Sequence, residues 1–281
     1  MTQAGQVVQP DERCIEAGGR LRKSSACPVV NPVSSDLRMV RSAPTFLAKN
    51  RILASLPRQN LLAIRAFLEP VVLSERAVLS EARRQLDHIY FLESGLVSRR
   101  VVSVGTMFET SVVGYRGAVG VSLLLNDHIE TEQHVVVVPG TAYRIQARDL
   151  FNAIADVPDL HQRLLQFARA FALHSAQAGL CGVRHGLEQR LASWLCLASD
   201  ALGADVIPVT HDYLSCVLGL RRAGVTETLI SFQEDGLIRK MRGVLQIDQR
   251  THLEQRACKC CRIIASAYSA SETLLSSVTS Q

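Results

Sequence analysis

The segment Val209–Ile238, VTHDYLSCVLGLRRAGVTETLISFQEDGLI, has the pattern of two short helices joined by a tight turn. Thr210 is a suitable N-terminal cap for a first helix over Asp212–Leu218, and Gly219-Leu220 supplies the turn. A second helix is expected from Arg221 to Phe232. This arrangement is typical of a helix-turn-helix motif, in which the second helix enters the major groove of DNA.

The second helix has an apolar face and an outward face. Val225, Leu229 and Phe232 are spaced four and three residues apart and form the buried stripe. The residues expected to meet DNA are Thr210, Arg221, Arg222, Ala223, Thr226, Glu227 and Arg242. The two arginines stand at the positive end of the helix dipole, where a cation is disfavoured by up to about 1 kcal/mol and a DNA phosphate is favoured. The alternative is two solvated arginines on an ordinary helical hairpin.

Two neighbouring patterns fit a winged helix. Apolar residues recur at helical spacing between Leu187 and Leu202, so this segment is predicted to form a supporting helix. Leu237-Ile238 and Val244–Ile247 are predicted to form two short strands around a turn at Arg242-Gly243. These strands would be the wing.

The chain from Pro70 to about Ile145 has a different pattern, after a short helix expected near Asn50–Leu68. Short runs rich in β-branched residues alternate with turn residues. The glycines that separate them are Gly95, Gly105, Gly114, Gly117, Gly120 and Gly140. Several short strands at such intervals predict an antiparallel sandwich or roll.

A long helix is expected to follow the strands. Its apolar positions alternate by four and three, as in a coiled-coil seam, and are Leu160, Leu164, Phe167, Phe171, His174, Ala178 and Cys181. A second stripe, Leu165, Ala168, Ala172 and Ala176, is expected to pack back onto the strands. The seam predicts a helix that pairs with a second copy of the chain. The alternative is a core helix whose contacts are all intramolecular.

The composition indicates a globular protein. The chain has 281 residues, 47% of them hydrophobic and 20% charged, with a net charge of +5. No apolar run approaches the roughly 20 residues of a membrane span, and the N-terminal sequence MTQAGQVVQPDERC lacks a signal-peptide pattern. We therefore expect a cytoplasmic protein. Residues 184–256 contain nine basic and nine acidic residues, so the prediction of DNA binding depends on pattern rather than on bulk charge.

The cysteines and the enzyme motifs argue against a catalytic or metal-dependent protein. Cys258, Cys260 and Cys261 form a CKCC cluster that lacks the spaced second pair of a typical zinc site. Cys14 and Cys27 lack companions for an iron–sulfur site. The chain has no P-loop, nucleophile elbow, dinucleotide fingerprint or HExxH. We expect no catalytic residue, no metal and no cofactor.

The order of these elements resembles the Crp/Fnr family of bacterial transcription regulators over roughly residues 46–256. The most similar segments are LGLRRAGVTET at 218–228, GLI at 236–238, and DHIYFLESGLVS at 87–98. The resemblance implies an α+β fold with an N-terminal antiparallel β-roll of the double-stranded jelly-roll type, a long dimerisation helix and a C-terminal winged helix-turn-helix. It also implies a homodimer that reads a palindromic site in double-stranded DNA. RNA polymerase is a further partner that the resemblance allows but does not require.

This resemblance and the patterns together predict five segments. They are a flexible leader at 1–45, a cyclic-nucleotide-binding-like sensor roll at 46–155, the dimerisation helix at 156–183, the DNA-binding domain at 184–256 and a C-terminal tail at 257–281.

The sequence departs from the family at both sites. Well-known members have an acidic residue at the position of Ala223 and an arginine at that of Glu227, so the usual DNA half-site is not expected. Members that bind cyclic nucleotides have Gly-Glu in the phosphate cassette, where this chain has Gly120-Val121-Ser122, and no Arg or Lys occurs in Leu123–Val138. We therefore expect no binding of cyclic AMP. The alternative function is a ligand-binding or protein-interaction module whose helix-turn-helix is structural only. The effector, the operator and the direction of regulation stay open.

Overall fold

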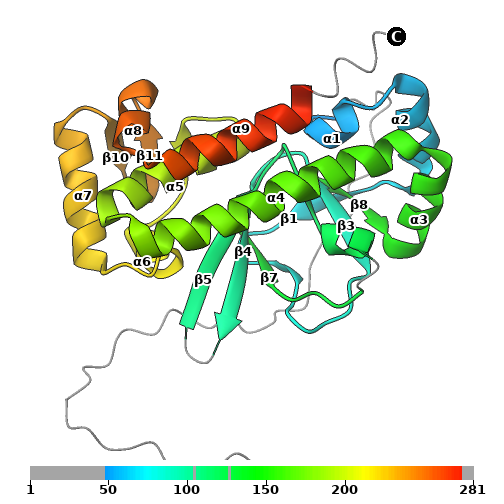
Figure 1. Ribbon diagram of the computed structural model, residues 1–281, viewed down its shortest axis with the longest axis horizontal. Helices are drawn as coiled ribbons and strands as arrows, with labels where there is room; N and C mark the ends of the chain where they lie inside the picture. Colours follow the sequence, from blue (N-terminus) through cyan, green and yellow to red (C-terminus); the bar gives the residue numbers. More distant parts are fainter. Residues whose placement is uncertain (1–47, 104–105, 126–127, 274–281) are drawn as a thin grey trace, which may run out of the picture.

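The computed structural model describes residues 48–103, 106–125 and 128–273. The predicted leader, Cys14 and Cys27 lie outside this part of the chain. The described residues form a β-roll, a long helix, a winged helix-turn-helix and a C-terminal helix that returns to the long helix (Figure 1). The predicted α+β fold is confirmed.

The roll consists of two antiparallel four-stranded sheets. One has the order β1 (Glu69–Leu73), β8 (Gly140–Gln146), β3 (His88–Leu92) and β6 (Ala118–Val119), and the other β2 (Val78–Ser80), β7 (Gln133–Val138), β4 (Leu96–Ser103) and β5 (Thr106–Val113). Short helices complete it: α1 (Arg51–Ala54), α2 (Arg58–Ile64), η1 (Arg65–Phe67), η2 (Val121–Leu125) and α3 (Ala147–Asp156). Consecutive strands of the chain often lie in different sheets, which is typical of a roll.

Asn50 attaches the first helix to the roll. Its side-chain oxygen accepts the backbone N–H groups of Ile52 and Leu53, so it caps α1. Its side-chain amide donates to the carbonyls of Leu92 and Gly117, both at 2.8 Å. Because one buried side chain satisfies groups on both elements, the start of the described chain is positioned on the sheet.

The long helix α4 spans Pro158–Arg184. Its 27 residues give a length of about 40 Å. Pro158 occupies the first helical turn, where its missing N–H costs nothing. The helix crosses the roll and continues past it to the helix-turn-helix, so it connects the two ends of the molecule (Figure 1).

The C-terminal part has a core of its own around Leu195, Leu229 and Phe232. Its elements are α5 (Leu187–Leu202), β9 (Val206–Ile207), α6 (His211–Val217), α7 (Arg222–Glu234), β10 (Ile238–Met241), β11 (Val244–Ile247) and α8 (Arg250–Arg256). The strands form a sheet in the order β10-β11-β9, with β10 and β11 as the predicted wing. Three residues of the roll strands, Leu96, Val112 and Val138, belong to the same core.

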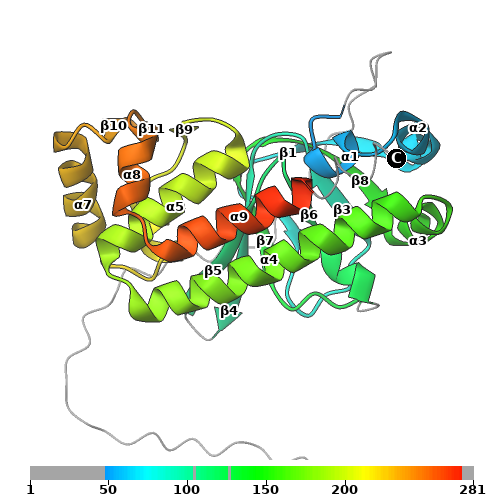
Figure 2. The same ribbon diagram turned by 45° about the horizontal axis from the view of Figure 1, so that its top comes forward.

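The segment after the wing contains a helix that the sequence did not predict. Residues 257–281 were expected to be a tail, but α9 spans Lys259–Thr273 and lies beside α4 in both views (Figures 1 and 2). Its serines, tyrosine and threonine are only moderate helix formers. The helix is stabilised by packing on α4, and Cys261, Ile264 and Tyr268 are spaced three and four residues apart on one face, a pattern that was overlooked in predicting a tail.

None of the helices within the described residues is long and apolar enough to cross a membrane.

Candidate nucleic-acid interface

The turn between α6 and α7 has the predicted chemistry. The Thr210 hydroxyl accepts the N–H of Tyr213 at 3.1 Å and caps α6. Gly219 has a φ of 60°, a left-handed conformation that glycine adopts without strain. The predicted stripe of Val225, Leu229 and Phe232 is fully buried. Thr210, which was predicted to meet DNA, therefore has a structural role here as a cap.

The opposite face of α7 is open to solvent. Arg222, Ala223 and Glu227 are exposed, and Ile230 is 41% exposed. Thr226 is half-buried because its hydroxyl lies 3.0 Å from Nδ1 of His211, on α6. The predicted face is thus a surface of the folded chain, and α7 lies at the end of the molecule far from α2 and α3 (Figure 1).

Arg222 makes an ion pair in the absence of DNA. Its Nε lies 2.5 Å from Asp212, and both side chains are 69% exposed. Such an exposed pair contributes at most about 1 kcal/mol and is easily exchanged for another partner. Arg221 precedes the helix, exposed and without a side-chain cap, and the first turn of α7 contains no acidic residue. The positive end of α7 is therefore open to an anion.

The wing adds positive charge beside α7. Arg242 lies exposed in the turn between β10 and β11, where Gly243 has a φ of 72°. Arg239 and Lys240 are exposed on β10. Lys240 and Arg222, after burial, are the causes that lower the pKa of His211. Arg239 is paired with Asp248 at 3.4 Å and Arg222 with Asp212, so part of this positive charge is balanced within the domain.

Comparison with known proteins agrees with this geometry. Residues 189–256 match the Crp-like helix-turn-helix domain. Among solved structures, FixK2 from Bradyrhizobium japonicum superposes with a TM-score of 0.59 at 13% identity, covering 68% of this chain and 98% of that one. The c-di-GMP-responsive regulator CLP from Xanthomonas campestris gives 0.57 at 14%, covering 68% and 99%. A Crp/Fnr-family structure from Eubacterium rectale gives 0.54 at 17%, covering 72% and 94%.

Residues 189–256 are a Crp-like helix-turn-helix domain, and the chain has the Crp/Fnr fold. At these identities the structural likeness concerns the fold alone. No curated protein sequence matches the chain.

Gly120, Val121 and Ser122, the residues compared above with a phosphate cassette, are held by contacts within the chain. Gly120 has a φ of 91°, and a Cβ there would lie 2.7 Å from the carbonyl oxygen of His88. Val121 is 8% exposed and begins η2. The Ser122 hydroxyl donates to Glu130 at 3.1 Å. The buried Glu130 also accepts the N–H of Thr131, so its carboxylate joins Ser122 to the segment that precedes β7.

Arg99 supplies a cation on the face of the roll that meets α4, which sequence reasoning missed. It forms an ion pair with Glu132, and its guanidinium lies 4.5 Å from the centre of the Phe171 ring. It also donates to Ser175 on α4 at 3.0 Å. Because this cation is already paired, it serves to join the roll to α4. A signal in the sequence existed, since Arg99 is a charge in the middle of a strand.

The predicted seam of α4 faces the chain's own residues, which corrects the expected orientation of this helix. Leu160, Leu164, Phe167, Phe171 and His174 are all at most 5% exposed in the single chain, and Ala178 and Cys181 are half-buried. The positions seven residues apart contact α9: the Phe167 and Tyr268 rings are 6.0 Å apart, and His174 lies 3.1 Å from the Tyr268 hydroxyl. The apolar stripe exists as predicted, but within this chain the helix that packs against it is α9.

Most of the second stripe of α4 is exposed. The sequence had assigned Leu165, Ala168, Ala172 and Ala176 to packing on the roll; only Ala168 is half-buried and packs against the roll core, whereas the other three are exposed. The exposed surface continues through Gly179 to Leu180 and Val183, which are 49% and 84% exposed. The side of α4 that was expected to face a second copy of the chain is covered by α9 and the roll, so the other side of the helix is the one left exposed.

A buried carboxylate connects the roll to the helix-turn-helix. Glu109 of β5 accepts hydrogen bonds from Nε1 of Trp194 on α5 at 2.5 Å, from the Tyr213 hydroxyl on α6 at 2.6 Å, and from Ser98. Burial raises the pKa of Glu109, while these three donors and Arg100 act in the opposite direction. Sequence reasoning missed this residue because its partners lie 85 and 104 residues away.

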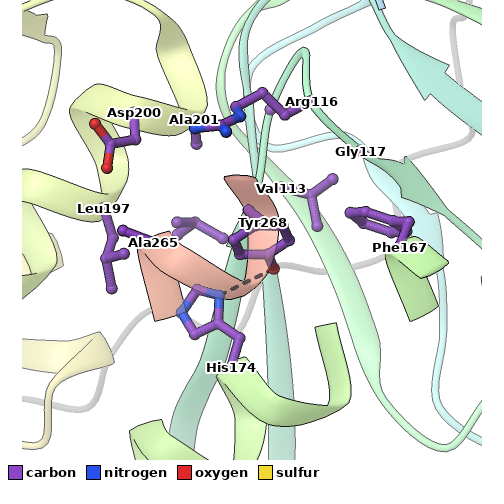
Figure 3. Close-up of a pocket in the computed structure, with 12 residues that line it drawn as sticks. Val113, Arg116, Gly117, Phe167, His174, Leu197, Asp200, Ala201, Ala265 and Tyr268 are labelled. Carbon is purple, nitrogen blue, oxygen red and sulfur yellow. Dashed lines mark hydrogen bonds between the residues drawn. The ribbon is translucent and has the colours of Figure 1, made fainter. Parts of the chain in front are cut away.

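The same junction contains a small cavity of about 30 Å³. Figure 3 shows His174 and Tyr268 directed toward each other in it, with Asp200 and Arg116 beside Ala201. Burial, together with Arg99, lowers the pKa of His174 to about 3. The imidazole therefore stays neutral at physiological pH, and it joins α4 to α9 as a hydrogen-bonding group rather than as a charge.

Proposed function

We infer that this protein regulates transcription by binding a palindromic site in double-stranded DNA, as a homodimer, with α7 reading the bases. The observation that carries this proposal is the exposed face of α7 in a domain that matches the Crp-like helix-turn-helix. A helix N-terminus without acidic neighbours attracts a phosphate, and an α-helix fits the major groove.

Each exposed residue has a distinct part in this proposal. Arg222 exchanges Asp212 for the O6 and N7 atoms of a guanine, a bidentate contact that a guanidinium fits. Glu227 accepts from the amino group of a cytosine. Arg242 in the wing contacts a phosphate and positions the domain without reading sequence. Contact with RNA polymerase stays a prediction.

The test begins with genome-wide mapping of bound DNA, followed by gel retardation on the mapped site and on random DNA. Arg222→Ala is expected to weaken specific binding by about 5- to 150-fold, which corresponds to 1–3 kcal/mol, and to affect random DNA much less. Arg148→Ala is the control, because Arg148 is 82% exposed on α3, in the roll. Equal losses on both DNAs would contradict base reading by Arg222. A folded protein that retards no genomic fragment would favour a structural role for the motif.

The proposed dimer uses the exposed stripe of α4. Ala172, Ala176 and Gly179 are small, so two copies of the helix can approach closely, and Leu180 and Val183 extend the apolar surface. These residues recur at intervals of three and four, as in a two-helix seam. Exposed apolar surface of this kind is stabilised by burial at about 25 cal/mol per Å².

Light scattering tests this surface. Leu180→Glu is expected to convert the dimer to a monomer, because it places two carboxylates at the axis. Leu62→Glu is the matched control, since Leu62 is a 51% exposed leucine on α2, and it should leave the dimer intact. A wild-type protein that is monomeric at micromolar concentration would refute the proposed dimer.

The roll is proposed not to bind cyclic AMP. Val121 stands where a carboxylate would hold the ribose, and the roll's Arg99 is paired with Glu132. Titration calorimetry should give no heat of binding at physiological concentrations of the nucleotide. Micromolar affinity would contradict the proposal.

A further inference from the structure

Three cysteines and a histidine converge where α4 ends and α9 begins. The side-chain ligand atoms of Cys181, His185, Cys258 and Cys260 all lie within 4.8 Å of one another. Cys181 and His185 are one helical turn apart at the end of α4. Cys258 immediately precedes α9 and Cys260 lies in its first turn. The sequence predicted no metal site, because CKCC has no second pair near it in the chain; the fold supplies that pair from α4.

The spacing of these atoms fits a single tetrahedral ion. Zinc binds thiolates at about 2.3 Å and imidazoles at about 2.0–2.1 Å, so in a tetrahedron two sulfurs lie about 3.8 Å apart and a sulfur and a nitrogen about 3.5 Å apart, and the distances here lie within about 0.4 Å of these values. The Cys181 and Cys258 sulfurs are 3.4 Å apart, and the Cys260 sulfur is 3.7 Å from Nδ1 of His185. A disulfide needs about 2.05 Å, and the cysteines here are free. The thiolates of a four-iron cluster bind four separate irons and must lie further apart.

Ser193 supports one of these ligands from α5. Its buried hydroxyl lies 3.2 Å from the Cys258 sulfur, accepts the Cys258 N–H at 3.1 Å and donates to the Gln189 carbonyl at 2.7 Å. Structural metal sites commonly have such a second layer of hydrogen bonds around their ligands. Arg190 and Cys181 line a second pocket, and the positive charge of Arg190 would balance the one net negative charge of three thiolates and a neutral imidazole around Zn²⁺.

We propose that Cys181, His185, Cys258 and Cys260 bind one Zn²⁺ ion that fastens the end of α4 to the start of α9. All four tetrahedral positions are filled by protein ligands, which is the arrangement of a structural site and leaves no position for a reacting water. Because the ligands come from both sides of the DNA-binding domain in sequence, the ion would stabilise the junction from which residues 187–256 project.

The experiment uses the full-length protein purified under reducing conditions. Elemental analysis should find one zinc per chain. X-ray absorption at the zinc edge should find three sulfur neighbours at about 2.3 Å and one nitrogen at about 2.0–2.1 Å. After chelation and reconstitution, Co²⁺ should give the thiolate charge-transfer and tetrahedral visible bands. The chelated protein should also unfold at a lower temperature, and one equivalent of Zn²⁺ should restore it.

Variants distinguish ligands from neighbours. Cys181→Ser and Cys258→Ser should lose stoichiometric metal and the cobalt spectrum. Cys261→Ser should keep both, because its sulfur faces the Ser193 carbonyl at 3.9 Å and does not belong to the cluster. If the serine variants fail to fold, His185→Ala tests the half-buried fourth ligand, with the expectation of weaker zinc binding.

Several results would overturn the site. They are a reduced wild-type protein that binds neither Zn²⁺ nor Co²⁺, iron and sulfide in place of zinc, a Cys181–Cys258 disulfide in the purified reduced protein, or an unchanged metal content in Cys181→Ser and Cys258→Ser.

Discussion

The substitution Glu109→Gln tests how the roll is held to the DNA-binding domain. One Glu109 oxygen accepts from Trp194, and the other accepts from Tyr213 and Ser98. An amide has a single acceptor oxygen, so at least one of the three donors loses its acceptor. The best arrangement keeps the oxygen on Trp194 while the NH₂ donates to the Tyr213 and Ser98 hydroxyl oxygens. Each hydrogen bond to a charged group contributes about 1.5–3 kcal/mol, and an unsatisfied buried donor costs about 1–3 kcal/mol. The neutral amide avoids the desolvation that raises the pKa of Glu109, which offsets part of this loss.

The expected net result is a decrease of about 2–4 kcal/mol in the free energy of unfolding, measured by urea denaturation. Trp194 is the only tryptophan in the chain, so its fluorescence reports on this contact directly. Its emission should shift to the red and become more accessible to a quencher. Glu69→Gln is the control, because the Glu69 side chain is 42% exposed in its ion pair with Arg144. This substitution should change the free energy of unfolding by at most about 1 kcal/mol. Unchanged stability and emission in Glu109→Gln would refute the reasoning.

Three further outcomes are expected. Burial and Arg99 lower the pKa of both His134 and His174 to about 3, against 6.5 when unfolded, so their contribution to stability is complete above pH 6.5 and is lost as the pH falls. Between pH 6.5 and 5, each of these two histidines should lower the free energy of unfolding by about 2 kcal/mol. Urea denaturation should therefore show that the stability of His174→Gln depends less steeply on pH than that of the wild type. Equal slopes for the two proteins would contradict this expectation. Arg242→Ala should weaken binding to all DNA sequences alike and reduce the salt slope by about one, whereas a sequence-dependent loss would argue against a phosphate contact. Glu227→Ala should relax base preference at one position per half-site without weakening binding to random DNA, as selection from a randomised site can measure.

The local patterns predicted those parts of the fold that depend on neighbours in sequence. The cap at Thr210, the turn at Gly219 and the buried stripe through Leu229 were all derived from spacing, because helix caps and amphipathic faces are properties of a few consecutive residues. The wing strands followed for the same reason.

The interactions that join distant segments were not predicted. The heptad spacing of α4 was recognised, yet spacing specifies an apolar face and not the helix that covers it. Tyr268, which contacts Phe167 and His174, lies in a segment whose apolar face (Cys261, Ile264, Tyr268) was overlooked, and its contact with His174 on α4 is made across 94 residues of sequence. Glu109 looked like an ordinary strand residue, since its partners are brought to it only by the tertiary fold.

The return of α9 to α4 limits how the DNA-binding domain can move. Residues 187–256 leave the body of the protein after α4 and re-enter it before α9, so the domain is attached by two chain crossings, near Gly186 and near Ala257. A domain on a single linker can swivel in every direction. Here the two crossings lie beside each other, and the domain is also bonded to the roll through Glu109. Any rearrangement that keeps α9 on α4 therefore has to move both crossings together and to break the contacts of Glu109 with Trp194 and Tyr213.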